Sequence, residues 1–92
     1  MDHADDRPPD VDKLREYQAQ LEITYEDKAA AAQSTRDHLE LVKYCEDNYD
    51  RFTKALWQCM QHGGDPEAIT LCTASAKQWR KRRRDHAAEA GN

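Results

Sequence analysis

The stretch His62-Gly63-Gly64-Asp65-Pro66 decides the fold of this chain. Its paired glycines allow the left-handed backbone that ends a helix, because glycine has no Cβ atom to clash. Asp65 can cap a following helix by accepting hydrogen bonds from free backbone N–H groups, and Pro66 suits the first helical position. The stretch therefore predicts the end of one helix, a tight turn at residues 62–65 and the start of another helix.

The segment before this turn, residues 11–61, contains neither glycine nor proline. Asp10 can cap a helix that begins at Val11. In the second half of the segment, apolar residues recur every three or four positions, which is the spacing of coiled-coil packing. These residues are Leu39, Val42, Cys45, Tyr49, Phe52, Leu56 and Cys59. We therefore expect one long helix over residues 11–61.

A second apolar stripe follows the turn and consists of Ile69, Cys72, Ala76 and Trp79. It predicts a helix over residues 66–88 that folds back antiparallel against the first helix. The two stripes then face each other, with the small Ala76 opposite the large Phe52. The expected fold class is all-α, namely an antiparallel helical hairpin with a long first helix, over residues 10–89.

The two expected helices differ in length, because the second one covers the first only back to about Glu40. The uncovered part carries an apolar stripe of its own, which we take as the candidate partner-binding site: Leu14, Tyr17, Leu21 and Tyr25. The alternative is a three-helix bundle that is broken near Ser34, a residue able to cap a new helix. Segment lengths favour the bundle. The neighbouring alanines and the lack of glycine and proline favour the continuous helix, which we expect.

Charge is divided unevenly along the chain. Residues 1–50 carry fourteen Asp and Glu against six Lys and Arg, whereas residues 51–92 carry four against eight. The most basic stretch contains Lys77, Arg80, Lys81, Arg82, Arg83 and Arg84. These six residues are the candidate nucleic-acid-binding site of an alternative function, with Trp79 available to stack on a base, or they form a nuclear-import signal. The simpler interpretation is that they neutralise acidic residues such as Glu46 on the facing helix, while Trp79 belongs to the core.

Cys59, His62 and Cys72 lie near the turn and have side chains that can bind metals. Zinc sites need four ligands, usually from two closely spaced pairs, and the second pair is missing here. Because Cys45, Cys59 and Cys72 all fall on the apolar stripes, we interpret them as buried thiols. The chain has no phosphate-binding glycine loop, and a helical hairpin offers no enclosed pocket. We therefore expect no metal, no cofactor, no catalytic residue and no small-molecule substrate.

The chain has 92 residues and a mean hydropathy of -1.13, and it contains no apolar run that would span a membrane. We expect a disordered acidic lead-in at residues 1–9 and a frayed tail at residues 90–92. A secretion signal is not apparent, so we expect a cytoplasmic protein with reduced cysteines, or a nuclear one in a eukaryote. Together these features predict a non-enzymatic interaction or assembly module. It would be an oligomeric, coiled-coil-like adaptor, small chaperone or complex subunit, with a second copy or another helical protein as its partner.

Overall fold

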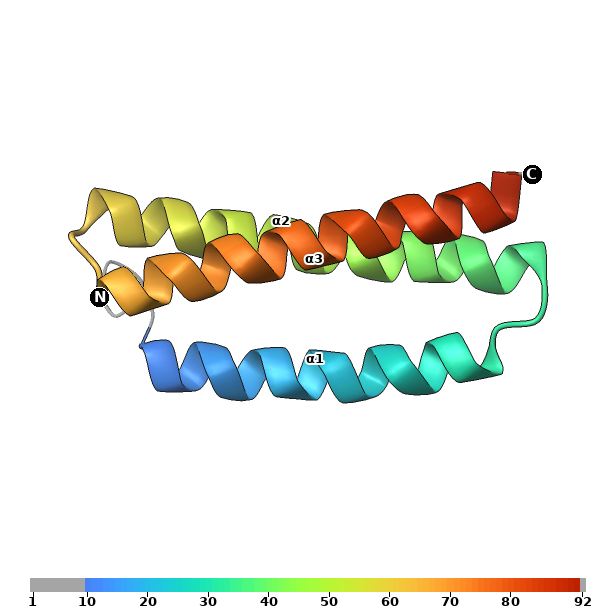
Figure 1. The fold of residues 1–92 in the computed structure, drawn as a ribbon, viewed down its shortest axis with the longest axis horizontal. Coiled ribbons are helices and arrows are strands. Elements are labelled where there is room, and N and C mark those ends of the chain that lie inside the picture. Colours follow the sequence, from blue (N-terminus) through green and yellow to red (C-terminus); the bar gives the residue numbers. More distant parts are fainter. Residues whose placement is uncertain (1–9, 92) are drawn as a thin grey trace, which may run out of the picture.

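The computed structural model describes residues 10–91, and this part of the chain folds into three α-helices without a strand (Figure 1). The helices are α1 (Val11–Ala31), α2 (Thr35–Gln61) and α3 (Pro66–Gly91). The all-α class predicted from the sequence is therefore confirmed. The acidic lead-in expected at residues 1–9 lies outside the described residues, as does residue 92.

The single helix predicted over residues 11–61 is wrong, because the backbone is extended at Ala32 (φ -69°, ψ 126°) and at Ser34 (φ -128°, ψ 165°). Two hydrogen bonds hold this break. The Asp37 N–H donates to Ser34 Oγ at 3.1 Å, and the Gln33 N–H donates to Asp37 Oδ2 at 3.0 Å. This reciprocal arrangement resembles a capping box and satisfies backbone groups that a helix start leaves free. The chain is therefore broken near Ser34, as the alternative prediction required.

The turn between α2 and α3 forms where the glycine pair predicts it. Gly63 has φ +66°, the left-handed conformation. At Gly64 the reason for glycine is space, because an added Cβ would lie 3.0 Å from the Cβ of Cys59. Asp65 caps α3 by accepting a hydrogen bond from the Glu67 N–H at 2.9 Å. The two glycines therefore have different tasks, one conformational and one steric.

Contacts along their length join α2 and α3 into an antiparallel hairpin (Figure 1). An ion pair connects Arg83 Nε to Glu46 Oε2 at 3.0 Å. Nearer the turn, Cys59 of α2 and Cys72 of α3 are both fully buried in the shared core. The helix α3 ends at Gly91, three residues beyond the predicted end at 88, so most of the expected frayed tail is helical.

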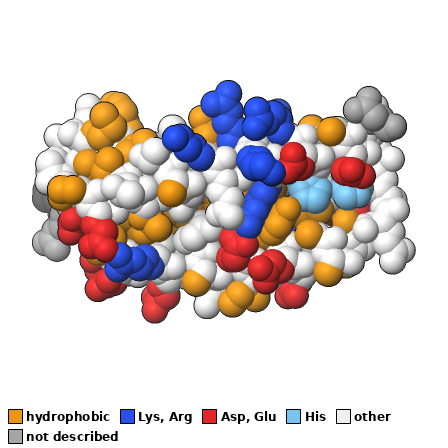
Figure 2. Space-filling view, in the orientation of Figure 1, with side chains coloured by type: hydrophobic (Ala, Val, Ile, Leu, Met, Phe, Trp, Pro, Cys, Tyr) orange, Lys and Arg blue, Asp and Glu red, His pale blue; other side chains and the backbone are white. Residues whose placement is uncertain are grey.

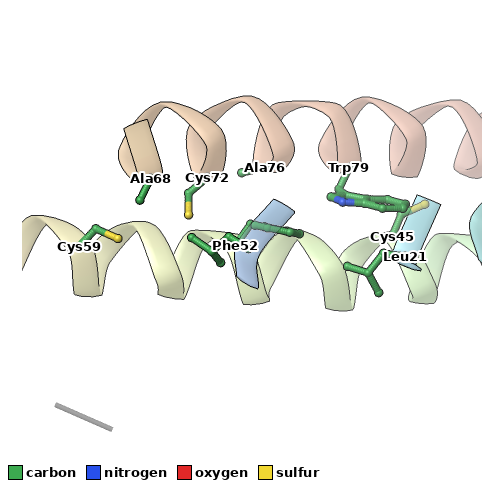
Figure 3. Close-up of a cluster of buried hydrophobic side chains, with 9 residues drawn as sticks. Leu21, Cys45, Phe52, Cys59, Ala68, Cys72, Ala76 and Trp79 are labelled. Atoms are coloured by element: carbon green, nitrogen blue, oxygen red, sulfur yellow. The ribbon is translucent and has the colours of Figure 1, made fainter. Parts of the chain in front are cut away.

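The core lies where the three helices meet, and Figure 3 shows Trp79 of α3 over Cys45 of α2 and beside Leu21 of α1. The buried residues of this core cluster are Leu14, Leu21, Cys45, Phe52, Cys59, Ala68, Cys72, Ala76 and Trp79, and Leu41 of α2 is buried outside the cluster. Only two of the nine cluster residues come from α1. The helix α1 is therefore a thin layer over one face of the α2–α3 hairpin.

The apolar stripe of α1 is not the uncovered overhang that a continuous helix implied. Leu14 and Leu21 are buried, and the ring of Tyr25 packs edge-on against Trp79 with 5.5 Å between ring centres. Tyr17 is 36% exposed, and its ring packs against Phe52 of α2 with 5.9 Å between ring centres. The break at Ser34 explains this difference, because it lets α1 turn back and lie alongside the hairpin (Figure 1). The four residues predicted to bind a partner therefore contact the chain's own helices.

Candidate interaction surface

Polar contacts fix α1 to the hairpin along the side that carries Trp79. The indole Nε1–H of Trp79 donates to Gln18 Oε1 at 2.9 Å. Next to it, the guanidinium of Arg82 donates two hydrogen bonds to the carboxylate of Glu22, at 2.9 and 2.5 Å. Trp79 is therefore a core residue, as the simpler interpretation of the sequence had it. A buried indole with a bound N–H offers no face on which a nucleobase could stack.

Arg82 belongs to the fold rather than to the surface. Its side chain is only 16% exposed, and its guanidinium lies 4.3 Å from the ring centre of Tyr25 and 4.8 Å from that of Trp79. A cation over two aromatic rings and against a carboxylate is held by cation–π attraction and by charge-assisted hydrogen bonds at once. The partner of Arg82 is Glu22 on α1, which sequence reasoning missed because the expected helix placed α1 elsewhere.

Of the other five residues of the predicted nucleic-acid site, two form ion pairs within the chain and three are exposed to solvent. Arg83 pairs with Glu46 on α2, and Lys81 pairs with Asp85 one turn along α3 at 3.1 Å. The remaining three are exposed and make no ion pair with a described residue: Lys77, Arg80 and Arg84. The expectation that the basic stretch neutralises the facing helix thus holds for Arg83, while three cations face solvent.

The face of the hairpin opposite α1 carries an exposed apolar patch. Trp57 and Met60 lie one turn apart on α2 and are 59% and 65% exposed. By helical periodicity Met60 lies about 180° and Trp57 about 120° around α2 from Arg51, which donates a hydrogen bond to Tyr17 of α1. We define the tip patch as Trp57 and Met60 together with the half-buried Leu56 and Ile69 beside the turn.

Charged groups lie further along α3 from the turn, with Lys77 about two helical turns and Arg84 about four turns beyond Ile69. Figure 2 shows hydrophobic side chains gathered near the turn and a cluster of Lys and Arg further along the molecule. A shallow hollow between α2 and α3 is lined by Glu46, Tyr49, Asp50, Arg80 and Arg83. Because the hollow carries both signs of charge, it suits a polar protein surface better than a polyanion. Protein interfaces usually have an apolar centre with polar groups around it, and the tip patch supplies the apolar part.

The opposite end of the molecule holds a chain of hydrogen bonds that the sequence did not reveal. The hydroxyl of Tyr25 contacts His86 Nε2 at 2.8 Å, and His86 Nδ1 contacts His38 Nδ1 at 3.0 Å. One of these two nitrogens must carry the proton of the bond, since two lone pairs would repel. Burial lowers the pKa of His86, and the neighbouring His38 lowers it further. Only the spatial register of the helices brings these residues together, so spacing along the chain gave no signal.

The three cysteines are buried free thiols, and this interpretation of the sequence is confirmed. Burial raises the pKa of Cys45 to about 11 and that of Cys72 to about 11, and it also raises that of Cys59. Such thiols stay protonated near neutral pH and are poor nucleophiles. His62 is exposed in the turn. Within residues 10–91, no group of three or more His, Cys, Asp or Glu side chains is arranged to hold a metal ion.

Comparisons of this chain with models of protein families, with curated proteins and with solved structures give no match. Among the described helices, none combines the length and the apolar character needed to cross a bilayer. The function is therefore inferred from the surface of the chain itself, where the tip patch and the three exposed cations are two features that the fold does not use.

Proposed function

We propose that this protein is a non-enzymatic interaction module that binds another protein through the tip patch. The observation that supports this most strongly is the exposure of Trp57 and Met60 in a chain that buries Trp79 and Phe52 completely. Tryptophan and methionine are enriched in the cores of protein interfaces, and tryptophan is among the residues that dominate binding energy. A partner that covers this patch would remove its apolar surface from water.

The exposed cations further along α3 support a helical partner with acidic residues. Lys77, Arg80 and Arg84 are available for ion pairs, and such pairs at the rim of an interface favour fast and selective association. A partner helix laid along the α2–α3 face would add a fourth helix to the three of this chain, as in helical bundles. The protein would then serve as an adaptor, a small chaperone or a subunit of a larger helical complex.

A cytoplasmic or nuclear location is part of this proposal. It is supported by three free cysteines in the chain, because free thiols persist in reducing compartments. Their burial also makes it unnecessary to assign them a chemical role.

The proposal is tested by comparing Trp57→Asp on α2 with Ile23→Asp on α1, two substitutions at similarly exposed apolar residues of different helices. Ile23 is 55% exposed and lies on α1. Both variants are tagged, checked for helix content by circular dichroism and used for capture from the native cell extract. We expect a protein that binds the wild-type chain and Ile23→Asp but is lost with Trp57→Asp. Equal capture by all three chains would contradict the proposed surface.

Nucleic-acid binding is the second candidate, and the exposed cations Lys77, Arg80 and Arg84 favour it. Three phosphate contacts would give a slope of about -2 to -3 in a plot of log affinity against log salt concentration. Substituting all three residues by Gln would then abolish binding to an RNA or DNA duplex or single strand. The candidate is weaker than protein binding because Arg82 and Arg83 are already paired within the chain and Trp79 is buried.

A further inference from the structure

The connection between α1 and α2 consists of three residues, Ala32-Gln33-Ser34, whose composition favours a helix over a turn. Ala29–Ala32 are four consecutive alanines, the strongest helix formers, and residues 11–61 contain neither glycine nor proline. The turn between α2 and α3, in contrast, contains a pair of glycines. The break is therefore maintained by the cap at Ser34 and by the docking of α1, rather than by residues that forbid a helix.

The contacts that dock α1 join it to the hairpin along its whole length. They are Arg15 with Glu67, Tyr17 with Arg51, Gln18 with Trp79, the Leu21 carbonyl with the hydroxyl of Tyr44, Glu22 with Arg82, and Tyr25 with His86. Leu14 and Leu21 add the buried apolar contacts. All of these contacts are formed between α1 and the other two helices, so the same contacts would form with the hairpin of a second, identical chain.

We propose that this protein forms a dimer in which two copies exchange α1. In the dimer, Ala32, Gln33 and Ser34 become helical, so that α1 and α2 are one helix from Val11 to Gln61. Such a helix is about 75 Å long, at 1.5 Å per residue, and it carries α1 away from its own hairpin. Each α1 then docks on the hairpin of the other copy, and the exchange is closed by a two-fold axis.

The exchanged form keeps the docking contacts and adds backbone hydrogen bonds. In the single chain, the Ala29 carbonyl accepts from the Ala32 N–H, the His38 N–H donates to the Ser34 carbonyl, and the cap binds the N–H groups of Gln33 and Asp37. The other carbonyls at the end of α1 and the other N–H groups at the start of α2 have no partner within a helix. These groups pair with each other once the connection is helical. Short connections of this kind are known to favour exchange between copies. The second copy would then be the partner of the stripe formed by Leu14, Tyr17, Leu21 and Tyr25.

This exchange does not depend on the proposed function, because the tip patch lies on the other face of the hairpin and stays uncovered in the dimer. The two proposals therefore fail separately. Loss of a partner protein on Trp57→Asp concerns the tip patch alone, whereas the oligomeric state concerns the connection between α1 and α2.

The oligomeric state of the full chain is measured by size-exclusion chromatography with light scattering over a range of concentrations. Ser34→Ala removes the cap and adds a helix former, so its dimer should dissociate at lower concentration than that of the wild type. Ala32→Gly with Gln33→Gly should weaken the dimer by about tenfold or more, because glycine disfavours the continuous helix in both copies. Ala74→Gly with Gln78→Gly is the matched control, since it makes the same changes at exposed positions of α3.

Cross-linking distinguishes exchange of α1 from any other dimer. A chain with Arg15→Cys is refolded together with a tagged chain that carries Glu67→Cys, because these two residues form an ion pair between α1 and α3. A short bismaleimide should link the two chains, while the wild-type pair, whose own thiols are buried, should not be linked. A monomer at every concentration, or a dimer without this link, would overturn the proposal.

Discussion

Substitution of Arg82 tests which residues of the basic stretch stabilise the folded chain and which only lie on its surface. Its guanidinium donates two hydrogen bonds to Glu22 and lies over the rings of Tyr25 and Trp79. A hydrogen bond to a charged group contributes about 1.5–3 kcal/mol, and a cation–π contact contributes about 0.5–2 kcal/mol. Because these contributions overlap and the pair is partly solvated, we expect Arg82→Ala to lower the free energy of unfolding by about 3 kcal/mol.

The matched control for this change is Arg84→Ala, two residues further along α3. Arg84 is exposed and makes no ion pair with a described residue, so its removal should change the free energy of unfolding by less than about 0.5 kcal/mol. Urea unfolding followed by far-ultraviolet circular dichroism gives both values. A double-mutant cycle with Glu22→Gln should show a coupling of about 1–2 kcal/mol. Equal losses in the free energy of unfolding for Arg82→Ala and Arg84→Ala would refute the claim that Arg82 stabilises the fold and Arg84 does not.

Three further predictions concern the turn, the histidine chain and the thiols. Gly63→Ala should lower the free energy of unfolding by about 1–2 kcal/mol, because φ is +66° there; an unchanged urea midpoint would contradict this. The lowered pKa of His86 means that the unfolded chain binds more protons below the ordinary value of 6.5, so stability should be lost as the pH falls through the lowered pKa. His86→Gln should flatten the curve of stability against pH in this range, and a steeper curve would argue against the histidine chain. Cys45 and Cys72, with pKa values raised to about 11, should react with a thiol reagent far more slowly in the native chain than in urea, and equal rates would show that they are accessible.

The turn could be predicted from the sequence because its signals are local. Gly63 supplies the left-handed backbone, and Asp65 caps the helix that follows, so both act within a few residues of their position. The packing of the hairpin followed from periodicity for the same reason. Phe52 and Cys59 belong to the periodic stripe of α2 and Trp79 to that of α3, and all three are buried.

The sequence alone could not decide between a break at Ser34 and a continuous helix over residues 11–61, because two opposing effects of similar size act there. Four alanines and the lack of glycine favour a continuous helix, whereas the cap formed by Ser34 and Asp37 favours a new start. Docking of Leu14 and Leu21 on the hairpin adds to the second effect, and this is a tertiary contribution that periodicity does not reveal.

The candidate interaction surface could not be predicted either, because the sequence does not reveal where α1 docks on the hairpin. Trp57 is visibly apolar in the sequence, but its exposure follows from which face of the hairpin α1 covers. The difference between Arg82 and Arg84 has the same origin, since only the position of Glu22 on α1 makes one arginine structural. The residue types of the surface were therefore predictable, whereas their exposure was not.

The most direct test of the proposed interaction surface is photo-crosslinking in the native cell. A photoreactive phenylalanine analogue replaces Trp57 of α2 in one variant and Ile23 of α1 in another, and these positions are 59% and 55% exposed. If the tip patch binds a partner, the variant with the probe at position 57 will be linked to one protein and the variant with the probe at position 23 will not. Linkage of that protein from position 23 alone, or from neither position, would contradict the proposal.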